Sequence, residues 1–210
     1  MARHATVIRM TSHEYASGAL VLIRHGETEW AVAGRHTGRT DVPLTARGED
    51  GARALRPLVA AFRPSLVLAS PLQRARRTAE LAGLTPNLDD DLVEWDYGGY
   101  EGLTSAEIRE RSGDPDWTVM QDGVVPGKTP GESIEEVAAR AARVIARVAP
   151  ALADGDVILV AHGHLLRILA ATYLRAEPRF AGQLLLGAGS LCVLRQDKDG
   201  GAIDTWNQRP

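Results

Sequence analysis

Three short apolar runs of the kind found in buried strands recur along this chain, and they constrain its fold more than any other feature. The runs are ALVLIR at 19–24, SLVLAS at 65–70 and DVILVA at 156–161. A continuous apolar run of this length is typical of a strand covered on both faces, as in a parallel sheet. Helical patterns separate the runs, and such alternation predicts helices on both sides of one sheet. We therefore expect an α/β fold, a three-layer α/β/α sandwich with a mostly parallel central sheet.

The helices follow from the spacing of apolar residues and from residues that start or stop a helix. Thr45 is a plausible N-cap, while Pro57 should kink or break the helix that follows it. Ser70 and Pro71 have the pattern of an N-cap followed by proline in the first turn. The segment 92–130 is mostly irregular. The expected helices cover 46–63, 71–82, 104–111, the stretch from Glu132 to Pro150, and the residues from Gly163 onward, and late strands are expected at 190–195 and 202–206.

Composition excludes several classes of protein. Of the 210 residues, 44% are hydrophobic and 24% are charged, which is ordinary for a globular protein and unlike a disordered chain. With 24 Lys and Arg against 27 Asp and Glu, the formal net charge of −3 gives no sign of nucleic-acid binding. The sequence has no run of about 18 apolar residues, so we expect no membrane span. We expect a flexible tail over residues 1–17 and a single domain over 18–210, and the sequence indicates no oligomeric state.

Cysteine usage bears on the compartment. Cys192 is the only cysteine, which excludes an internal disulfide framework and a cysteine-rich zinc site. Because it lies in an apolar run, we expect it to be buried and inert. Residues 1–17 lack the continuous apolar run of an export signal. These features favour a cytoplasmic protein.

Basic side chains follow the ends of all three expected strands. Arg24 and His25 end the first strand, Arg74 lies in the first turn after the second, and His162 follows the third. Ligands of such sheets bind beyond the carboxyl ends of the strands, so these four side chains should meet at one edge. Two guanidiniums and two imidazoles need an anion between them, and guanidinium matches phosphate in shape and charge. The helix that begins behind His162 adds free N–H groups, so the pattern predicts a phosphate site.

Five motifs, in this order along the chain, resemble one known family. They are LIRHGETEW, TGRTDVPLT, SPLQRARRTA, EWDYGGYEG and AHGH, and the resemblance that they carry spans roughly residues 19–195. In order and content they resemble the histidine phosphatase superfamily, with its phosphoglycerate mutase-like fold. That superfamily includes cofactor-dependent phosphoglycerate mutases, acid phosphatases and sugar bisphosphatases. The resemblance is greater to the acid phosphatase and sugar bisphosphatase branches than to the mutases.

The resemblance implies a role for each strand-end residue. His25 would be the nucleophile that becomes phosphorylated. Arg24, Arg74 and His162 would hold the phosphoryl oxygens, with the backbone of Gly163 nearby. The two arginines should also keep the imidazole of His25 unprotonated and therefore nucleophilic.

The resemblance also implies a proton donor and a second pair of pocket residues. Glu94, in the EWDYGGYEG motif, would protonate the leaving group and then activate water, and we favour it over its neighbours Asp96 and Glu101. Next to a phosphate dianion its carboxyl should favour the protonated form. Thr37 and Gly38 match the pair that lines the pocket beside the nucleophile.

Several residues near the motifs remain open. Many members carry Asn where this chain has Ala31, so that phosphate contact does not transfer. His164 is expected to support or cap the site, while His36 either lines the pocket mouth or lies on an exposed loop. Lys128 and the GES triplet 131–133 are expected to rim the active site. For the aromatic residues Trp30, Trp95, Tyr97 and Tyr100, packing under the loops and lining a substrate cleft are both possible, with packing favoured for Trp30.

The chemistry expected from these residues needs no metal and no cofactor. A magnesium-dependent enzyme would need clustered carboxylates, and the only acidic run, Asp89 to Asp91, is expected to be a solvated loop. The expected function is a metal-independent phosphomonoesterase acting on small phosphorylated metabolites through a phosphohistidine. The alternatives are a cofactor-dependent phosphoglycerate mutase and a non-catalytic phosphate-binding module. Mutases carry a longer basic insertion, whereas 95–130 has only Arg109 and Arg111, followed by Lys128, as cations.

Overall fold

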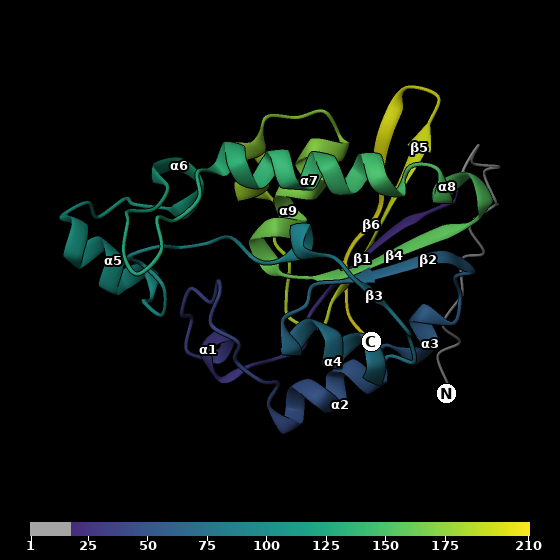
Figure 1. The fold of residues 1–210 in the computed structure, drawn as a ribbon, viewed down its shortest axis with the longest axis horizontal. Coiled ribbons are helices and arrows are strands. Elements are labelled where there is room, and N and C mark those ends of the chain that lie inside the picture. The colour runs from purple at the N-terminus through teal and green to yellow at the C-terminus, as the bar shows by residue number, and fades with distance from the viewer. Residues whose placement is uncertain (1–17) are drawn as a thin grey trace, which may run out of the picture.

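A six-stranded sheet runs through the part of the chain that the computed structural model describes, residues 18–210 (Figure 1). Our expectation for residues 1–17 lies outside these residues. The strand order is β3-β2-β4-β1-β5-β6. The first four strands of this order run parallel, β5 pairs antiparallel with β1, and β6 pairs antiparallel with β5. The strands are β1 (Leu20–Arg24), β2 (Pro64–Ala69), β3 (Asn87–Leu88), β4 (Asp156–Ala161), β5 (Leu191–Asp197) and β6 (Gly200–Gln208).

Helices cover both faces of this sheet. In Figure 1, α2, α3 and α4 lie on one side, and α7 and α9 on the other. The expected α/β fold with a mostly parallel sheet between helical layers is confirmed. The helices are α1 (Glu29–Val32), α2 (Ala46–Ala54), α3 (Arg56–Val59), α4 (Gln73–Leu81), α5 (Ser105–Ser112), α6 (Val119–Asp122), α7 (Ile134–Val148), α8 (Ala151–Asp154) and α9 (Gly163–Tyr173), with short 3₁₀ helices η1 (Asp90–Leu92) and η2 (Pro178–Gln183).

Alternation along β1 divides the apolar core in two. Leu20 and Leu22 pack into a core shared with α7 and α9, whereas Val21 and Ile23 pack into a core shared with α4. Successive side chains of a strand point to opposite faces, so one apolar run fills both cores. This is why the first, second and fourth strands of the chain read as continuous apolar sequence.

The helix expected over 46–63 is interrupted at Leu55, between α2 and α3, in agreement with the expectation that Pro57 kinks or breaks it. It differs from the prediction in ending at Val59 rather than at residue 63. The helix expected over 71–82 begins at Gln73, and its backbone N–H is taken by the carboxylate of Asp41 at 2.8 Å. Ser70 is therefore not its N-cap, and that prediction is wrong.

The segment between β3 and α7 extends away from the sheet at the left of Figure 1. It holds α5 and α6. A capping box starts α5, in which Thr104 and Glu107 each accept from the other's backbone N–H. The short α6 was not expected from the sequence, and neither was β3. The late strands are longer than predicted and pair with each other as an antiparallel hairpin.

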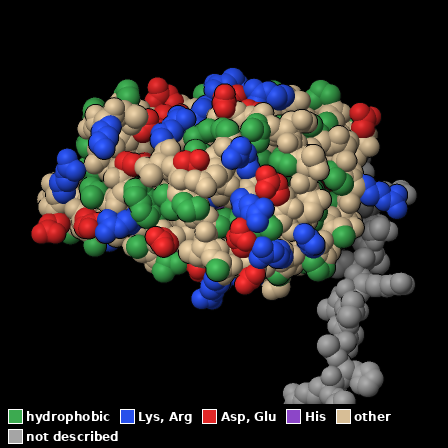
Figure 2. Space-filling view, turned by 60° about the horizontal axis from the view of Figure 1, so that its bottom comes forward, with side chains coloured by type: hydrophobic (Ala, Val, Ile, Leu, Met, Phe, Trp, Pro, Cys, Tyr) green, Lys and Arg blue, Asp and Glu red, His purple; other side chains and the backbone are tan. Residues whose placement is uncertain are grey.

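No helix among residues 18–210 is long and apolar enough to cross a membrane. On the face shown in Figure 2, basic and acidic side chains are interspersed. Cys192 is buried in β5, and burial raises the pKa of its thiol to about 11. A thiol of this kind stays protonated at neutral pH, in agreement with the expectation that it is inert.

Candidate active site

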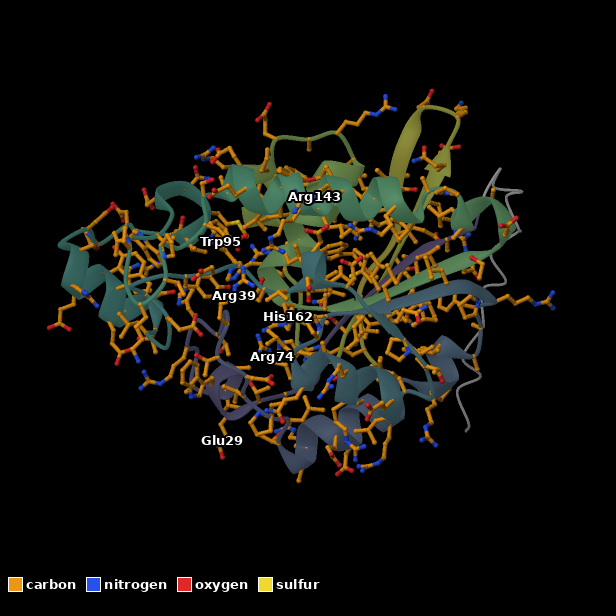
Figure 3. The ribbon with its side chains drawn as sticks, in the orientation of Figure 1. Glu29, Arg39, Arg74, Trp95, Arg143 and His162 are labelled. Carbon is orange, nitrogen blue, oxygen red and sulfur yellow. The ribbon has the colours of Figure 1, made fainter. Side chains whose placement is uncertain are left out.

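The strand-end residues meet as expected. His25 directly follows β1, and His162 directly follows β4, the strand that pairs with β1. Their imidazole rings lie 5.2 Å apart between centroids, in an edge-to-face arrangement. Figure 3 shows Arg74 and His162 close together where the sheet ends. The parallel pairing of β1, β4 and β2 therefore brings these groups to one point.

The imidazole of His25 is oriented by the backbone carbonyl of the next residue. The side chain is only 5% exposed, and Nδ1 lies 2.7 Å from the carbonyl oxygen of Gly26. A carbonyl can only accept, so Nδ1 carries the hydrogen and Nε2 carries the lone pair. Nε2 has no hydrogen-bond partner among residues 18–210. Burial, then the charges of Arg74 and Arg24, lower the pKa of His25 well below its ordinary value, so the ring is neutral.

His162 is also neutral, but both its nitrogens are engaged. Arg74 donates from Nε to Nδ1 at 3.2 Å, which leaves the hydrogen on Nε2 to be donated to the hydroxyl of Ser70 at 2.7 Å. Burial, then the charge of Arg74, lowers the pKa of His162 well below its ordinary value. Ser70, the first residue of the SPLQRARRTA motif, therefore contacts His162 rather than capping α4.

Arg74 is fully buried and is held by carbonyl oxygens. Its Nη1 donates to Thr40 at 2.9 Å, and its Nη2 donates to Thr37 at 3.1 Å and to Gly38 at 3.0 Å. We expected the group of cations and imidazoles to need an anion. The structure differs, because both imidazoles are neutral and these carbonyls satisfy the guanidinium.

Thr37 and Gly38 therefore serve the site mainly through their backbone. The hydroxyl of Thr37 donates to the carbonyl of Arg35 at 3.1 Å, and the N–H of Gly38 donates to both carboxylate oxygens of Glu101 at 3.0 Å. Thr37 lines the cavity described below, and Gly38 does not. The geometry gives Gly38 no free donor for a phosphate.

Arg24 is the guanidinium with an unused donor. Its Nη1 donates to the carbonyl of Leu186 at 2.5 Å, but its buried Nε has no partner among residues 18–210. A side chain at Gly163 would lie 3.2 Å from this Nε, so glycine there allows the guanidinium to rest against the start of α9. A buried N–H without an acceptor is costly and uncommon. Arg24 also lines the cavity described below, so its guanidinium is available to an anion bound there.

Glu94 is fixed against the start of α9. Its Oε1 accepts from the backbone N–H of Trp95 and of Leu165, both at 2.9 Å, and its Oε2 accepts from the N–H of His164 at 3.0 Å. The carboxylate is 4% exposed and lines the cavity. Oε2 accepts only one of these bonds, so it retains a lone pair that a proton can occupy.

The two neighbouring carboxylates are used elsewhere. Asp96 accepts from the N–H of Gly98 at 2.9 Å and from the hydroxyl of Thr129 at 2.5 Å. Glu101 accepts from the N–H groups of Gly38 and Thr40. Neither lines the cavity, which favours Glu94 among the three as the group available for proton transfer.

Arg140 on α7 braces the segment that carries Glu94. Its guanidinium donates to the carbonyl oxygens of Asp91 and Val93 and pairs with the carboxylate of Glu132 at 2.8 Å. The GES triplet thus lies behind Glu94 and lines a second, neighbouring cavity. Lys128 lines neither cavity. The expectation that Lys128 and the triplet rim the active site is wrong, and the role of Arg140 was missed.

The acidic run is not a solvated loop. Asp91 pairs with Arg143 at 2.5 Å, and Asp89 and Asp91 both pair with Arg147, all across to α7. Its carboxylates thus hold the chain before Glu94 against that helix. Among residues 18–210, no group of three or more His, Cys, Asp and Glu side chains could hold a metal ion.

A cavity of roughly 610 Å³ opens over Arg24, His25 and Glu94, lined on its far side by residues of α5, α6 and η2. Its arginines are Arg24, Arg35, Arg109, Arg167 and Arg179, and among residues 18–210 Glu94 is the only acidic residue that lines it. Arg35, Arg167 and Arg179 were not expected from the sequence to line the active site. Of the aromatic candidates only Tyr97 lines the cavity, joined by Trp117, which was not anticipated. Trp95 and Tyr100 belong to the core, and Trp30 lies beside Gly102.

Comparison with known proteins agrees with the motifs. The model of the histidine phosphatase superfamily, branch 1, matches residues 20–209. An acid phosphatase of Mycobacterium tuberculosis is 41% identical over 159 residues, covering 74% of this chain and 75% of the relative. Sedoheptulose 1,7-bisphosphatase of Saccharomyces cerevisiae is 35% identical over 185 residues, covering 73% and 66%.

Solved structures and further relatives extend this result. The structure of the Rv3214 open reading frame product of Mycobacterium tuberculosis superposes with a TM-score of 0.85 at 34% identity, covering 91% of this chain and 98% of that one. Other relatives at similar identity are named 2,3-bisphosphoglycerate-dependent phosphoglycerate mutases. The family match spans nearly the whole chain, and the motif residues Arg24, His25 and Glu94 line one cavity. The chain is therefore an enzyme of the histidine phosphatase superfamily.

Proposed function

We propose that this protein is a metal-independent phosphomonoesterase of small phosphorylated metabolites that works through a phosphohistidine. The observation that carries the proposal is the free Nε2 lone pair of the neutral, buried His25. It shares a cavity with the unpaired Nε–H of Arg24 and the carboxyl of Glu94. A nucleophile, an anion donor and a proton donor are the parts that phosphoryl transfer without a metal requires.

In the first step, Nε2 of His25 attacks phosphorus and the bond from phosphorus to the ester oxygen breaks. The leaving oxygen takes the proton of the Glu94 carboxylic acid. The ring becomes cationic as the N–P bond forms, and its Nδ1–H then donates more strongly to the carbonyl of Gly26. The short contact at Nδ1 therefore supports attack by Nε2.

In the second step, water attacks the phosphohistidine and Glu94, now a carboxylate, takes its proton. The N–P bond breaks, and the bonding pair returns to Nε2 of His25. Phosphate leaves, and both residues regain their starting protonation states. One carboxyl thus acts as acid and then as base, as the reversal of the step requires.

We propose that Arg24 and the start of α9 hold the transferring group. The unpaired Nε–H of Arg24 is the direct donor, and the backbone N–H of Gly163, in the first turn of α9, is a second. Arg74 and His162 contribute from behind, since the side chains of both are engaged within the protein. Arg74 adds fixed positive charge close to the equatorial oxygens, where charge accumulates.

The test is hydrolysis of a panel of phosphomonoesters, with release of inorganic phosphate measured before and after exhaustive chelation. We expect full activity in EDTA, because residues 18–210 offer no cluster of metal ligands. Loss of activity in EDTA with rescue by magnesium or zinc would contradict the mechanism. The same panel, with sugar phosphates and bisphosphates beside aryl phosphates, would reveal the substrate preference.

A phosphoglycerate mutase is the second candidate, and one observation favours it. Arg35, Arg109, Arg167 and Arg179 line the cavity beyond Arg24, so its outer part suits a substrate with additional negative charge. Because Arg35, Arg167 and Arg179 lie outside the segment 95–130, the small number of cations in that segment does not exclude a mutase. Conversion of 3-phosphoglycerate in the presence of 2,3-bisphosphoglycerate, without net phosphate release, would establish this alternative.

Two further parts of the proposal concern partners and location. We propose a catalytic enzyme rather than a phosphate-binding module, because binding alone requires neither a free nucleophile nor a fixed carboxyl. We also propose a cytoplasmic location, which the buried and unreactive Cys192 supports. The interspersed charges in Figure 2 are in keeping with small-molecule substrates rather than nucleic acid.

A further inference from the structure

The side chains that line the active-site cavity are held in different ways. His36 lines the cavity rather than lying on an exposed loop, and so does His164. Each of these rings contacts a neighbouring carbonyl or hydroxyl through Nδ1. Arg24 is held instead by the loop 184–190, and this loop is itself held by the end of β6. The orientation of Arg24 thus depends on residues that do not line the cavity.

The contacts of the loop 184–190 lie on two of its sides. On the cavity side, the carbonyl of Leu186 accepts from Nη1 of Arg24 at 2.5 Å. On the other side, Oδ1 of Asn207, near the end of β6, accepts from the backbone N–H of Gly187 at 2.8 Å. The guanidinium and the amide side chain therefore contact consecutive residues of one loop.

The two hydrogen bonds belong to a single peptide group. The carbonyl of Leu186 and the N–H of Gly187 are its polar ends, and every peptide bond among residues 18–210 is trans. In a planar trans peptide these ends point in opposite directions, so Arg24 and Asn207 lie on opposite sides of the group. Rotation of the peptide would break the bond to Asn207. Hydrogen bonds in series also polarise one another, which makes this carbonyl a better acceptor for Arg24.

Asn207 reaches this peptide because β6 is irregular at that point. From Thr205 to Gln208 the chain advances three residues, while the paired residues of β5 advance only two. Asn207 has a φ of 57°, in the left-handed region, and its N–H donates to the thiol of Cys192 at 3.2 Å. Asparagine is one of the few residues that adopt this conformation readily. A bulge of this kind re-aims a side chain, and bulges are frequent next to active sites.

Other contacts fix the loop where it joins β5. The N–H of Gly189 donates to the carbonyl of His25 at 2.9 Å, and the carbonyl of Ser190 accepts from the N–H of Arg24 at 3.1 Å. These bonds join the loop to the backbone at the end of β1. The peptide that faces the guanidinium is held separately, from outside the cavity, by Asn207.

We propose that Asn207 is a positioning residue that orients the guanidinium of Arg24 through the peptide between Leu186 and Gly187. With Nη1 held on this carbonyl, the unpaired Nε–H of Arg24 remains available to a phosphoryl group. Without Asn207 the peptide is free to turn, and the guanidinium spends less time in the orientation that binds the anion. This inference rests on the role proposed above for Arg24 and adds to it a residue outside the cavity.

The direct test compares Asn207→Gly with Asn207→Asp. Glycine adopts the left-handed conformation without strain but removes the acceptor, whereas aspartate keeps an acceptor oxygen and also tolerates this conformation. We expect Asn207→Gly to weaken inhibition by inorganic phosphate roughly three- to tenfold, part of the effect of one hydrogen bond to phosphate. Asn207→Asp should stay within about twofold of the wild type, because it retains the bond to Gly187. Unchanged inhibition in a folded Asn207→Gly, or equal weakening in both variants, would overturn the proposal.

A matched control separates positioning from a loosened strand. Gln208→Gly makes the same change at the exposed neighbour in β6 and should leave phosphate inhibition unchanged. A loss as large as that of Asn207→Gly would show that any glycine at the end of β6 disturbs the site, and would overturn the proposal.

A double variant tests whether Asn207 acts through Arg24. In an Arg24→Lys background, adding Asn207→Gly should weaken phosphate inhibition no further, because an ammonium lacks the guanidinium fork that the carbonyl of Leu186 orients. Losses that multiply in full would show that Asn207 acts independently of Arg24, and would overturn the proposal.

A measurement on the unaltered protein keeps the proposal testable if the variants fold poorly. Phosphate bound by Arg24 should polarise the peptide behind it, so the NMR signals of the Gly187 N–H and of the Asn207 side-chain amide should shift as inorganic phosphate is added. Phosphate that shifts the N–H of Gly163 but neither of these signals, or that does not bind, would overturn the proposal. If the wild type hydrolyses no phosphomonoester, the function proposed above fails, whereas this titration still decides the role of Asn207.

Discussion

The two walls of the active-site cavity are built in different ways. On the sheet side, His25 is buried and Arg24 is half-buried at the end of β1. Each donates a hydrogen bond to a backbone carbonyl, which restricts its side chain. On the opposite side, Arg109 and Arg179 extend from the short elements α5 and η2, and Arg179 pairs with an exposed glutamate, Glu135. A buried, fully packed wall can hold reacting groups in fixed geometry, whereas an exposed wall can vary in charge and shape at little cost in stability. This difference leads us to propose that the sheet edge carries the chemistry, while the outer wall can vary in charge and shape without disturbing it.

The largest effect should come from the nucleophile on the sheet side. His25→Ala removes the free Nε2 of the imidazole that directly follows β1. Within residues 18–210, the imidazole that directly follows β4, that of His162, has both nitrogens engaged. We expect kcat to fall on the order of a thousandfold or more for every ester, together with loss of any trapped phosphoenzyme. Single-turnover kinetics with an aryl phosphate measure both. Turnover near the wild-type rate in a folded variant would mean that another group attacks.

The proton donor should give a smaller effect that depends on the substrate. Glu94→Gln cannot protonate a leaving group, so alkyl phosphates should slow by roughly 10²–10⁴-fold, while activated aryl phosphates slow far less. Rates for a series of esters with different leaving groups measure this dependence. Equal losses on all esters would show that Glu94 is not the acid.

Two neighbouring carboxylates provide matched controls for that variant. Asp96→Asn and Glu101→Gln make the same chemical change in residues that accept backbone hydrogen bonds but do not line the cavity. Both should alter stability more than the dependence on the leaving group. A steep leaving-group dependence in either control would move the proton donor to that residue.

The neutral histidines of the cavity should make stability depend on pH. Burial lowers the pKa of His25, His162 and His164 below 6.5, so the unfolded chain holds more protons than the folded one between the lowered and ordinary values. The contribution of these neutral rings to the free energy of unfolding should therefore be complete above pH 6.5. As the pH falls below that value, the free energy of unfolding should decrease by up to about 1.4 kcal/mol per pH unit for each histidine. Urea unfolding between pH 8 and pH 5 measures this slope, and a flat or opposite slope would contradict the burial of neutral rings.

The smallest effect concerns Ala31, which lines the cavity from α1. Its methyl group cannot donate a hydrogen bond, and a bond to a charged phosphate is worth about 1.5–3 kcal/mol. Ala31→Asn should tighten inhibition by inorganic phosphate about tenfold. It should raise turnover little, because the contact is equal in the ground and transition states. The matched control is Val32→Asn, the exposed neighbour that does not line the cavity. An unchanged inhibition constant for Ala31→Asn would mean that position 31 does not face the phosphate.

The strand-end residues of the sheet side could be predicted from sequence because neighbouring residues in the chain determine where each strand ends. Apolar runs define the strands, parallel strands end at one edge, and Arg24, His25 and His162 stand directly at those ends. Even there, hydrogen-bond partners were not predictable. Ser70 before a proline fits an N-cap equally well, and only the chain path that brings Asp41 to Gln73 shows that α4 begins later.

The outer wall could not be predicted in the same way. Arg35, Arg167 and Arg179 reach the cavity from three separate segments, and no local pattern indicates that these segments converge. Arg140 and Glu132 are eight residues apart around the start of α7, yet their value to the site lies in bracing the segment before Glu94. Such roles depend on the tertiary arrangement of irregular segments, which hydrophobic periodicity does not encode.

The identity of the phosphorylated atom tests the central claim most directly. The enzyme would be quenched under alkaline conditions during turnover of an aryl phosphate, and the phosphoryl group would be located by mass spectrometry and phosphorus NMR. Because Nδ1 of His25 is held by the carbonyl of Gly26, we predict a phosphoryl group on Nε2 of His25, labile to acid. Phosphorylation of Nδ1, of another residue, or of no residue while turnover proceeds would contradict the account.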